Sequence, residues 1–395
     1  MIRSIYTAQF WLLCLSSFLF FASFNMIIPE LPGYLSSMGG QDYIGLIIFL
    51  FALTAGISRP FSGKLTDRIG RIPVMVAGAV VAAICGAIYP WVSAVWAFLL
   101  LRFFHGFSTG FKPTGTVAYL ADIVPANRRG EAIGVAGLSG SLGMASGPAL
   151  GSWLAELWSL DLMFYASSAS ALLSVLILAG MKETLSFPEK FKISVLRISW
   201  ADVYQKSVVT PSLIMMLTVF SFGIILTIIP DYSEFIGLTN KGWFFTVFTL
   251  SSVGIRFFAG KASDKFGRIN VMLVSTSLLM LSMILIALSE TPFALLSAAV
   301  VFGVAAGMNA PTLFAWAIDL SDKKYFGRAM ATLYIALEIG VGSGALISGT
   351  IYSSDDSRFP YAFSCGAITA GFALIFLIWK KTQAQAQAGL EKKTP

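Results

Sequence analysis

The chain has 395 residues, of which 56% are hydrophobic and 12% are charged, about half the roughly 25% charged share of soluble domains. Its formal net charge is +7, with the basic residues spread over many short segments rather than gathered in one patch. This composition excludes an ordinary soluble domain and argues against a nucleic-acid partner.

Apolar stretches of about 18 to 25 residues recur along the whole chain, and each is long enough to cross a hydrocarbon core of roughly 30 Å. Continuous apolarity favours helices over barrel strands, and the first stretch is too long, with too little charge before it, for a cleaved signal. We predict twelve transmembrane helices, at residues 7–29, 43–63, 72–91, 94–121, 131–154, 162–181, 208–229, 242–260, 270–289, 292–318, 329–352 and 359–379.

The basic residues test this topology. An even number of spans places both termini on one side of the membrane, and this side then receives 21 of the 27 Lys and Arg residues. Only Lys241 and Arg358 fall clearly on the other side. Because cytoplasmic loops are enriched in Lys and Arg, we predict a multi-pass protein of the cell inner membrane with both termini in the cytoplasm.

A charged segment occurs twice, at residues 63–71 and 260–268, with an offset of 197 residues. The same offset relates Gly106 to Gly303 and Asp122 to Asp319. A repeat in a hydrophobic protein of this length indicates a transporter built from two similar halves. We therefore expect an all-α membrane protein with two pseudo-symmetric six-helix bundles, at residues 1–181 and 208–380, joined by a cytoplasmic linker (182–207) that includes a short surface helix near 193–200, and followed by a solvated tail (381–395).

Three cysteines fall inside the predicted spans, and no spacing suggests a disulfide framework or a metal site. We expect no metal and no cofactor. A single histidine and the lack of a nucleophile cluster also argue against an enzyme.

The segment from Gly63 to Arg71 resembles the signature between helices two and three of the major facilitator superfamily, and the second copy resembles its weaker echo between helices eight and nine. With twelve spans, the resemblance covers nearly the whole chain and implies the major facilitator fold. It also implies that loop charges latch the inner side shut when the outer side is open; the alternative is simple solvated charge. The latch residues would be Arg59, Gly63, Asp67, Arg68, Gly70, Arg71, Asp122, Arg129, Arg256, Asp264, Arg268, Asp319 and Arg328.

The fifth span carries glycines at helical spacing, which form a smooth face for another helix, and a proline that bends it. Its residues Gly134, Gly143, Gly147, Pro148 and Gly151 resemble the antiporter motif of the twelve-helix drug and metabolite:proton antiporters of this superfamily. The motif's last position is usually another glycine but is Ser152 here. The resemblance favours export over import, and the alternative is a packing groove without directional meaning.

The fourth span places Arg102, His105 and Lys112 on roughly one helical face. Cations inside a membrane must face a wet cavity or acids, so we predict contact with substrate for all three. Arg102 and His105 resemble a family motif in which the histidine is a glutamine, and this change adds a group that titrates near neutrality. A packed hydrogen-bond donor is the alternative for His105.

Few acids are available as partners. Glu30 follows the first span, where Asn25, a predicted substrate contact, also lies. Glu30 and Arg102 are placed to pair in the outer half of the membrane. Glu338 lies ten residues past Arg328, which is about 15 Å into the membrane. We expect it to be a lone buried carboxylate that carries protons, or else a neutral packing residue.

At a similar depth, Lys112, Asn309 and Glu338 are predicted to line one central site. The resulting hypothesis is proton-coupled efflux of a drug or of an anionic or zwitterionic metabolite by alternating access, with Glu338, Glu30, Arg102 and His105 in proton coupling. The alternative is a proton symporter that imports a sugar or an organic acid. The expected partners are a small-molecule substrate, protons and the lipid bilayer, and we expect a monomer.

Overall fold

The structure is a computed structural model that describes residues 6–125, 129–199, 203–321 and 326–391. These residues form twelve long helices and no strand. The helices are α1 (Ala8–Ile27), α3 (Ile44–Arg68), α4 (Arg71–Ile88), α5 (Val95–Ile123), α6 (Arg129–Leu157), α7 (Leu160–Ala179), α9 (Val209–Phe235), α10 (Trp243–Phe266), α11 (Arg268–Ala287), α12 (Pro292–Leu320), α13 (Phe326–Tyr352) and α14 (Phe359–Glu391).

Short helical segments lie in the connections. One is α2 (Leu31–Ser37), an α-helix that we did not predict, and the others are single 3₁₀ turns. These turns are η1 (Ile28–Glu30), η2 (Gln41–Tyr43), η3 (Tyr89–Trp91), η5 (Ile193–Leu196), η6 (Lys206–Val208) and η8 (Asp356–Arg358).

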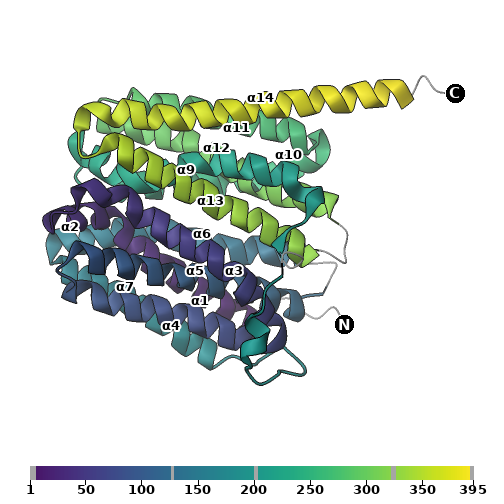
Figure 1. Cartoon of the computed structure of the whole chain (residues 1–395), viewed down its shortest axis with the longest axis horizontal. Coiled ribbons are helices and arrows are strands. Elements are labelled where there is room, and N and C mark those ends of the chain that lie inside the picture. The colour runs from purple at the N-terminus through teal and green to yellow at the C-terminus, as the bar shows by residue number, and fades with distance from the viewer. Residues whose placement is uncertain (1–5, 126–128, 200–202, 322–325, 392–395) are drawn as a thin grey trace.

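The long helices form two six-helix bundles, which lie one above the other in Figure 1. In the first bundle α1 packs on α6 and α7, and α5 packs on α3 and α4. In the second bundle α9 packs on α13 and α14, and α12 packs on α10 and α11, which is the same pattern. The predicted fold class, an all-α membrane protein with two pseudo-symmetric six-helix bundles, is therefore confirmed.

The internal repeat holds at the level of single contacts. A Cβ atom at Gly106 would overlap the carbonyl of Phe51, and one at Gly303 would overlap the carbonyl of Phe248. Gly106 and Gly303 are 197 residues apart, and so are Phe51 and Phe248. Glycine at these positions lets α5 approach α3, and α12 approach α10, with backbones in contact.

Nine of the described helical spans are long and apolar enough to cross a membrane, and the two parts of α10, bent by 49°, make a tenth. The two other long helices, α5 and α6, are not apolar enough to count as membrane spans by the same measure. For α5 the physical reason is its charge, since it contains Arg102, Lys112 and Asp122. The residues that weaken its membrane signal are those expected to serve function.

The far end of the chain differs from the prediction. The last helix, α14, was expected to end near residue 379 and instead continues to Glu391, because the alanines and glutamines of this segment favour helix. The segment near residues 193–200 was expected to form a surface helix, and its described part, residues 193–199, contains the single turn η5 and no α-helix. The predicted domain boundaries stay predictions.

The two bundles meet through two helix pairs, α3 with α13 and α6 with α10. We call the side where α1 begins and α14 ends the terminal side (right in Figure 1) and the other the distal side. On the distal side a Cβ atom at Gly45 would lie 2.9 Å from the carbonyl oxygen of Ala345, and one at Gly242 would overlap Pro148. The bundles are therefore in close contact on the distal side.

Candidate functional site

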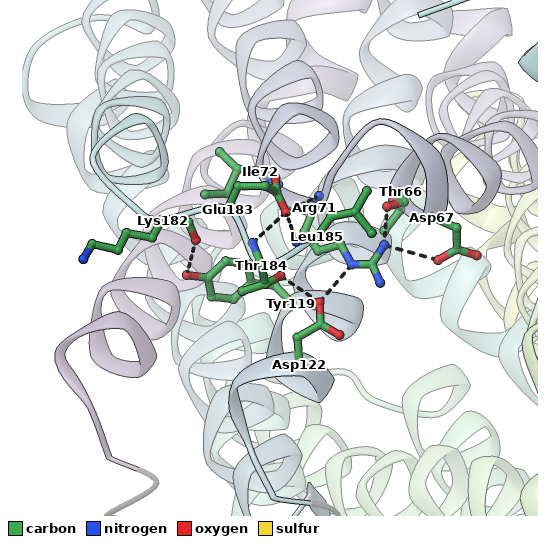
Figure 2. Close-up of polar contacts among 10 residues, drawn as sticks. All are labelled: Thr66, Asp67, Arg71, Ile72, Tyr119, Asp122, Lys182, Glu183, Thr184 and Leu185. Carbon is green, nitrogen blue, oxygen red and sulfur yellow. Dashed lines mark hydrogen bonds and ion pairs between the residues drawn. The ribbon is translucent and has the colours of Figure 1, made fainter. Parts of the chain in front are cut away.

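The first signature loop is organised around Arg71, as Figure 2 shows. Its Nε donates to Asp122 Oδ2 at 3.0 Å, and its Nη1 donates to the carbonyl oxygen of Thr66 at 2.5 Å and to Asp67 Oδ1 at 3.5 Å. Gly70 turns the chain between α3 and α4 with φ +139°, in the region that favours glycine. All of these residues belong to the first bundle.

Glu183 completes this network and was not predicted (Figure 2). Its carboxylate accepts from the backbone N–H groups of Arg71 at 3.1 Å and Ile72 at 2.9 Å, which are the first of α4. A carboxylate at a helix N-terminus satisfies unpaired donors and complements the helix dipole. Thr184, the next residue, donates to Asp122 at 2.7 Å. Sequence reasoning missed Glu183 because its repeat position is Lys380.

The second copy repeats the side-chain geometry. Arg268 Nε donates to Asp319 Oδ2 at 2.8 Å, and Nη1 donates to Asp264 Oδ1 at 2.6 Å and to Ser263 Oγ at 2.7 Å. The residue before α11, Gly267, has no side chain with which to cap the helix. A surface cleft of about 350 Å³ lies beside this helix start, between Gly267 and Asp319.

Two other predicted latch residues lie in the first signature loop. Arg68 Nη1 lies 3.9 Å from Glu189 Oε2, and Gly63 has open space around its Cα. Arg328 is half-buried near the start of α13, and the side chain of Arg129 lies outside the described residues. In this structure the contacts described for Arg71 and Arg268 do not join one bundle to the other, and the latch role stays a prediction.

Arg59 and Glu338 join the two bundles. Arg59 Nη2 of α3 donates to Glu338 Oε1 of α13 at 2.8 Å, with side-chain exposures of 10% and 11%. The guanidinium also lies over the ring of Tyr334, at 4.3 Å from its centroid. Glu338 is therefore not the lone carboxylate that we predicted, because Arg59 reaches it from the other bundle. The carboxylate is nearly buried, as we predicted.

Arg256 makes the equivalent contact at the second helix pair. Its Nη1 donates to Ser141 Oγ of α6 at 2.8 Å. Arg256 is the repeat partner of Arg59, and Ser141 is the repeat partner of Glu338. Two pseudo-symmetric arginines thus bridge the bundles, one to a carboxylate and the other to a hydroxyl.

Arg102 and His105 form a buried polar cluster with Tyr89 inside the first bundle. Arg102 Nε donates to the carbonyl oxygen of Ile47 at 3.1 Å, and Nη1 donates to Tyr89 Oη at 3.3 Å. Tyr89 Oη lies 3.2 Å from His105 Nδ1, while Nε2 of the histidine has no partner among the described residues. The ring of Phe51 covers the guanidinium at 4.6 Å.

Glu30 does not pair with Arg102, so that prediction is wrong. Equal depth does not make two residues face each other: Glu30 Oε1 accepts from Ser152 Oγ at 2.7 Å and lines a distal cleft of about 280 Å³ with Lys241. Lys241 Nζ lies 2.5 Å from Glu234 Oε2. Burial acts to lower the pKa of Lys241, but the hydrogen bond from Lys241 to Glu234 and the charge of Glu30 outweigh it and raise the pKa.

Lys112, Asn309 and Glu338 do not line one site in this structure. Lys112 Nζ donates to Ser17 Oγ of α1 at 2.9 Å, while Asn309 Oδ1 accepts from Thr218 of α9 at 3.2 Å. Each therefore turns to a helix of its own bundle and not to α3, which Glu338 contacts. Asn25 likewise donates within α1, to the carbonyl oxygen of Phe21 at 2.7 Å.

The glycines of the antiporter motif pack against α1. A Cβ atom at Gly147 would lie 2.7 Å from the carbonyl oxygen of Ala22, and one at Gly143 or Gly151 would also overlap the α1 backbone. Gly134 lies in α6, with surroundings outside the described residues. Next to Pro148, Thr246 of α10 donates to the carbonyl oxygen of Ala145 at 2.7 Å. The motif helix thus contacts α1 and the other bundle at once.

Comparison with known proteins agrees with this architecture. The chain matches the Major Facilitator Superfamily profile over residues 13–239 and 212–394. It is 26% identical to the multidrug resistance protein MdtG of Salmonella arizonae over 91% of each chain, and 25% identical to the quinolone resistance protein NorA of Staphylococcus aureus over 95% of this chain and 98% of NorA.

Among solved structures, the human organic anion transporter MFSD10 superposes with a TM-score of 0.73 at 19% identity, covering 94% of this chain and all of MFSD10. At that identity the likeness concerns the fold alone. The family profile spans nearly the whole chain, and the repeat and the two bundles agree with it. The chain belongs to the Major Facilitator Superfamily and is a membrane transporter rather than an enzyme.

Proposed function

We propose that this transporter exports a small organic molecule, a drug or an anionic or zwitterionic metabolite, in exchange for protons. The relatives named as multidrug and quinolone resistance proteins support export, and the distribution of Lys and Arg supports a cytoplasmic terminal side and an inner-membrane location. With the bundles in contact on the distal side, this structure then corresponds to a state closed to the outside. We propose that a monomer suffices.

The Arg59–Glu338 ion pair is the observation that carries the proposal. The pair joins α3 to α13, and toward the terminal side a Cβ atom at Gly63 would already meet nothing within 4 Å. The pair therefore lies where the bundles separate. Breaking a buried ion pair by neutralising one partner costs about 3–5 kcal/mol. Protonation of Glu338 would weaken the attachment of one bundle to the other, which couples a proton to the change of state.

The other proposed groups take secondary places in this scheme. Glu30, in the distal cleft, is proposed to exchange protons with the outside. Arg102 supplies positive charge near the bundle contact, because Phe51, which covers it, is on α3. His105 is connected to Arg102 through Tyr89. We propose that the substrate contacts Arg102 and His105. Contact with Asn25, Lys112 and Asn309 would require the helices to move first.

Proteoliposomes that carry the purified protein test the proposal with ethidium and norfloxacin under an imposed pH gradient. An antiporter accumulates substrate in the acidic compartment, against the proton flow, whereas a symporter accumulates it in the alkaline compartment. We expect Glu338→Gln to abolish gradient-driven accumulation. Glu290→Gln, which neutralises an exposed acid between α11 and α12, is the matched control and should transport normally.

Two results would contradict this proposal. Accumulation in the alkaline compartment would show symport and import. Undiminished gradient-driven transport by Glu338→Gln, with the protein inserted and folded, would remove the ion pair from the coupling.

A further inference from the structure

The two arginines that bridge the bundles have different surroundings. The offset of 197 residues relates Arg59 to Arg256, Glu338 to Ser141 and Tyr334 to Gly137. Arg59 is held by the Glu338 carboxylate at 2.8 Å and stacks on the Tyr334 ring at 4.3 Å. At Arg256 both of these groups are replaced by smaller ones: Ser141 has a hydroxyl in place of the carboxylate, and Gly137 has no side chain in place of the ring.

Open space replaces the missing groups. A Cβ atom at Gly137 would meet nothing within 4 Å, and both Gly137 and Arg256 are exposed. Farther toward the distal side, by contrast, Thr246 and Ala145 are hydrogen-bonded across the bundles. The space beside Arg256 therefore lies where the bundles part, toward the terminal side.

The charge of Arg256 is not neutralised by the residues around it. Among the residues that the structure describes, no carboxylate lies within ion-pair distance, and its one hydrogen-bond partner is Ser141 Oγ at 2.8 Å. A guanidinium presents five donors in a planar fork that matches a carboxylate, and bidentate pairs of this kind are the strong ones. A cation within a membrane-spanning helix indicates a ligand or ion pathway.

We propose that Arg256, Ser141 and Gly137 form a binding subsite for an aromatic carboxylate. The carboxylate of the ligand takes the place that Glu338 occupies at Arg59, and its ring takes the place of Tyr334. The inference rests on the proposed function and narrows its substrate class, since the subsite opens toward the side from which an exporter loads. At the repeat position, Arg59 already binds a carboxylate and an aromatic ring, so the same fold accommodates this combination of groups.

Binding to the purified full-length protein in detergent tests the subsite. The probes are 2-naphthoate and its neutral counterpart 2-naphthamide, measured by calorimetry. We expect naphthoate to bind at least about tenfold more tightly than naphthamide, as for a charge-assisted contact. Arg256→Gln should abolish this difference, and Arg256→Lys should retain part of it.

A second variant places a carboxylate of the protein where the ligand carboxylate is proposed to bind. Ser141→Glu supplies a carboxylate where Glu338 stands in the repeat, so it should close the Arg256 fork and weaken naphthoate binding by about tenfold or more. Thermal unfolding at or above the wild-type temperature would show that this variant is folded. Equal affinity for the two probes, or unchanged naphthoate binding in Arg256→Gln or in folded Ser141→Glu, would overturn the proposal.

Transport of ethidium in proteoliposomes separates this inference from the proposed function. Proton-driven ethidium transport without Arg256-dependent naphthoate binding would refute the subsite and leave proton-coupled export standing. Arg256-dependent naphthoate binding without any proton-driven transport would support the subsite and refute proton-coupled export.

Discussion

The contact of Gly45 with α13 should determine how firmly the bundles close on the distal side. A Cβ atom at Gly45 would lie 2.9 Å from the carbonyl oxygen of Ala345, 3.1 Å from that of Leu346 and 3.2 Å from Gly349 Cα. A valine there adds two further methyl groups, so α3 and α13 must move apart. Overpacking of this kind costs about 1–3 kcal/mol, which at about 1.4 kcal/mol per factor of ten shifts the equilibrium about 5- to 150-fold toward separated bundles.

Pulsed electron paramagnetic resonance measures this shift directly. Spin labels at Trp91, on the first bundle, and Phe293, on the second, sit at distal positions that are 80% and 83% exposed. With the native cysteines replaced, the wild type should give mainly the short distance of the closed distal side. We expect Gly45→Val to add a population at longer distance.

Gly33→Val is the matched control, because Gly33 lies in the distal helix α2 and a Cβ atom there meets nothing within 4 Å. It should leave the distance distribution unchanged. If Gly45→Val also leaves the distribution unchanged, the close backbone contact does not control closure and the reasoning is refuted.

Two further predictions concern the signature loops. Glu183→Ala should lower the free energy of unfolding by about 1–2 kcal/mol, the cost of losing a helix N-cap, and an unchanged thermal unfolding temperature would contradict the capping role. Asp122→Asn should destabilise more than Asp319→Asn in the same assay. Among the described residues, Asp122 accepts hydrogen bonds from both Arg71 and Thr184, whereas Asp319 accepts from Arg268 alone. Equal effects would count against a larger network in the first bundle.

The sequence by itself determined the membrane class, the twelve helices and the two-bundle repeat. Segment length, apolarity and an exact offset are properties of the chain, and they do not depend on how the helices turn toward each other. The same offset located Ser141 and Gly137 as the counterparts of Glu338 and Tyr334. Burial of Glu338 was also expected from the sequence, and its side chain is 11% exposed.

Only the tertiary structure decided which groups meet. Periodicity places a side chain on a face of its own helix but does not fix the rotation of that helix against a distant neighbour. Arg59 and Glu338 are 279 residues apart and form an ion pair, whereas Glu30 and Arg102, matched in depth, have separate partners. Glu183 illustrates the same limit, since its role depends on a linker folding back onto α4, and no periodic pattern in the sequence records that contact.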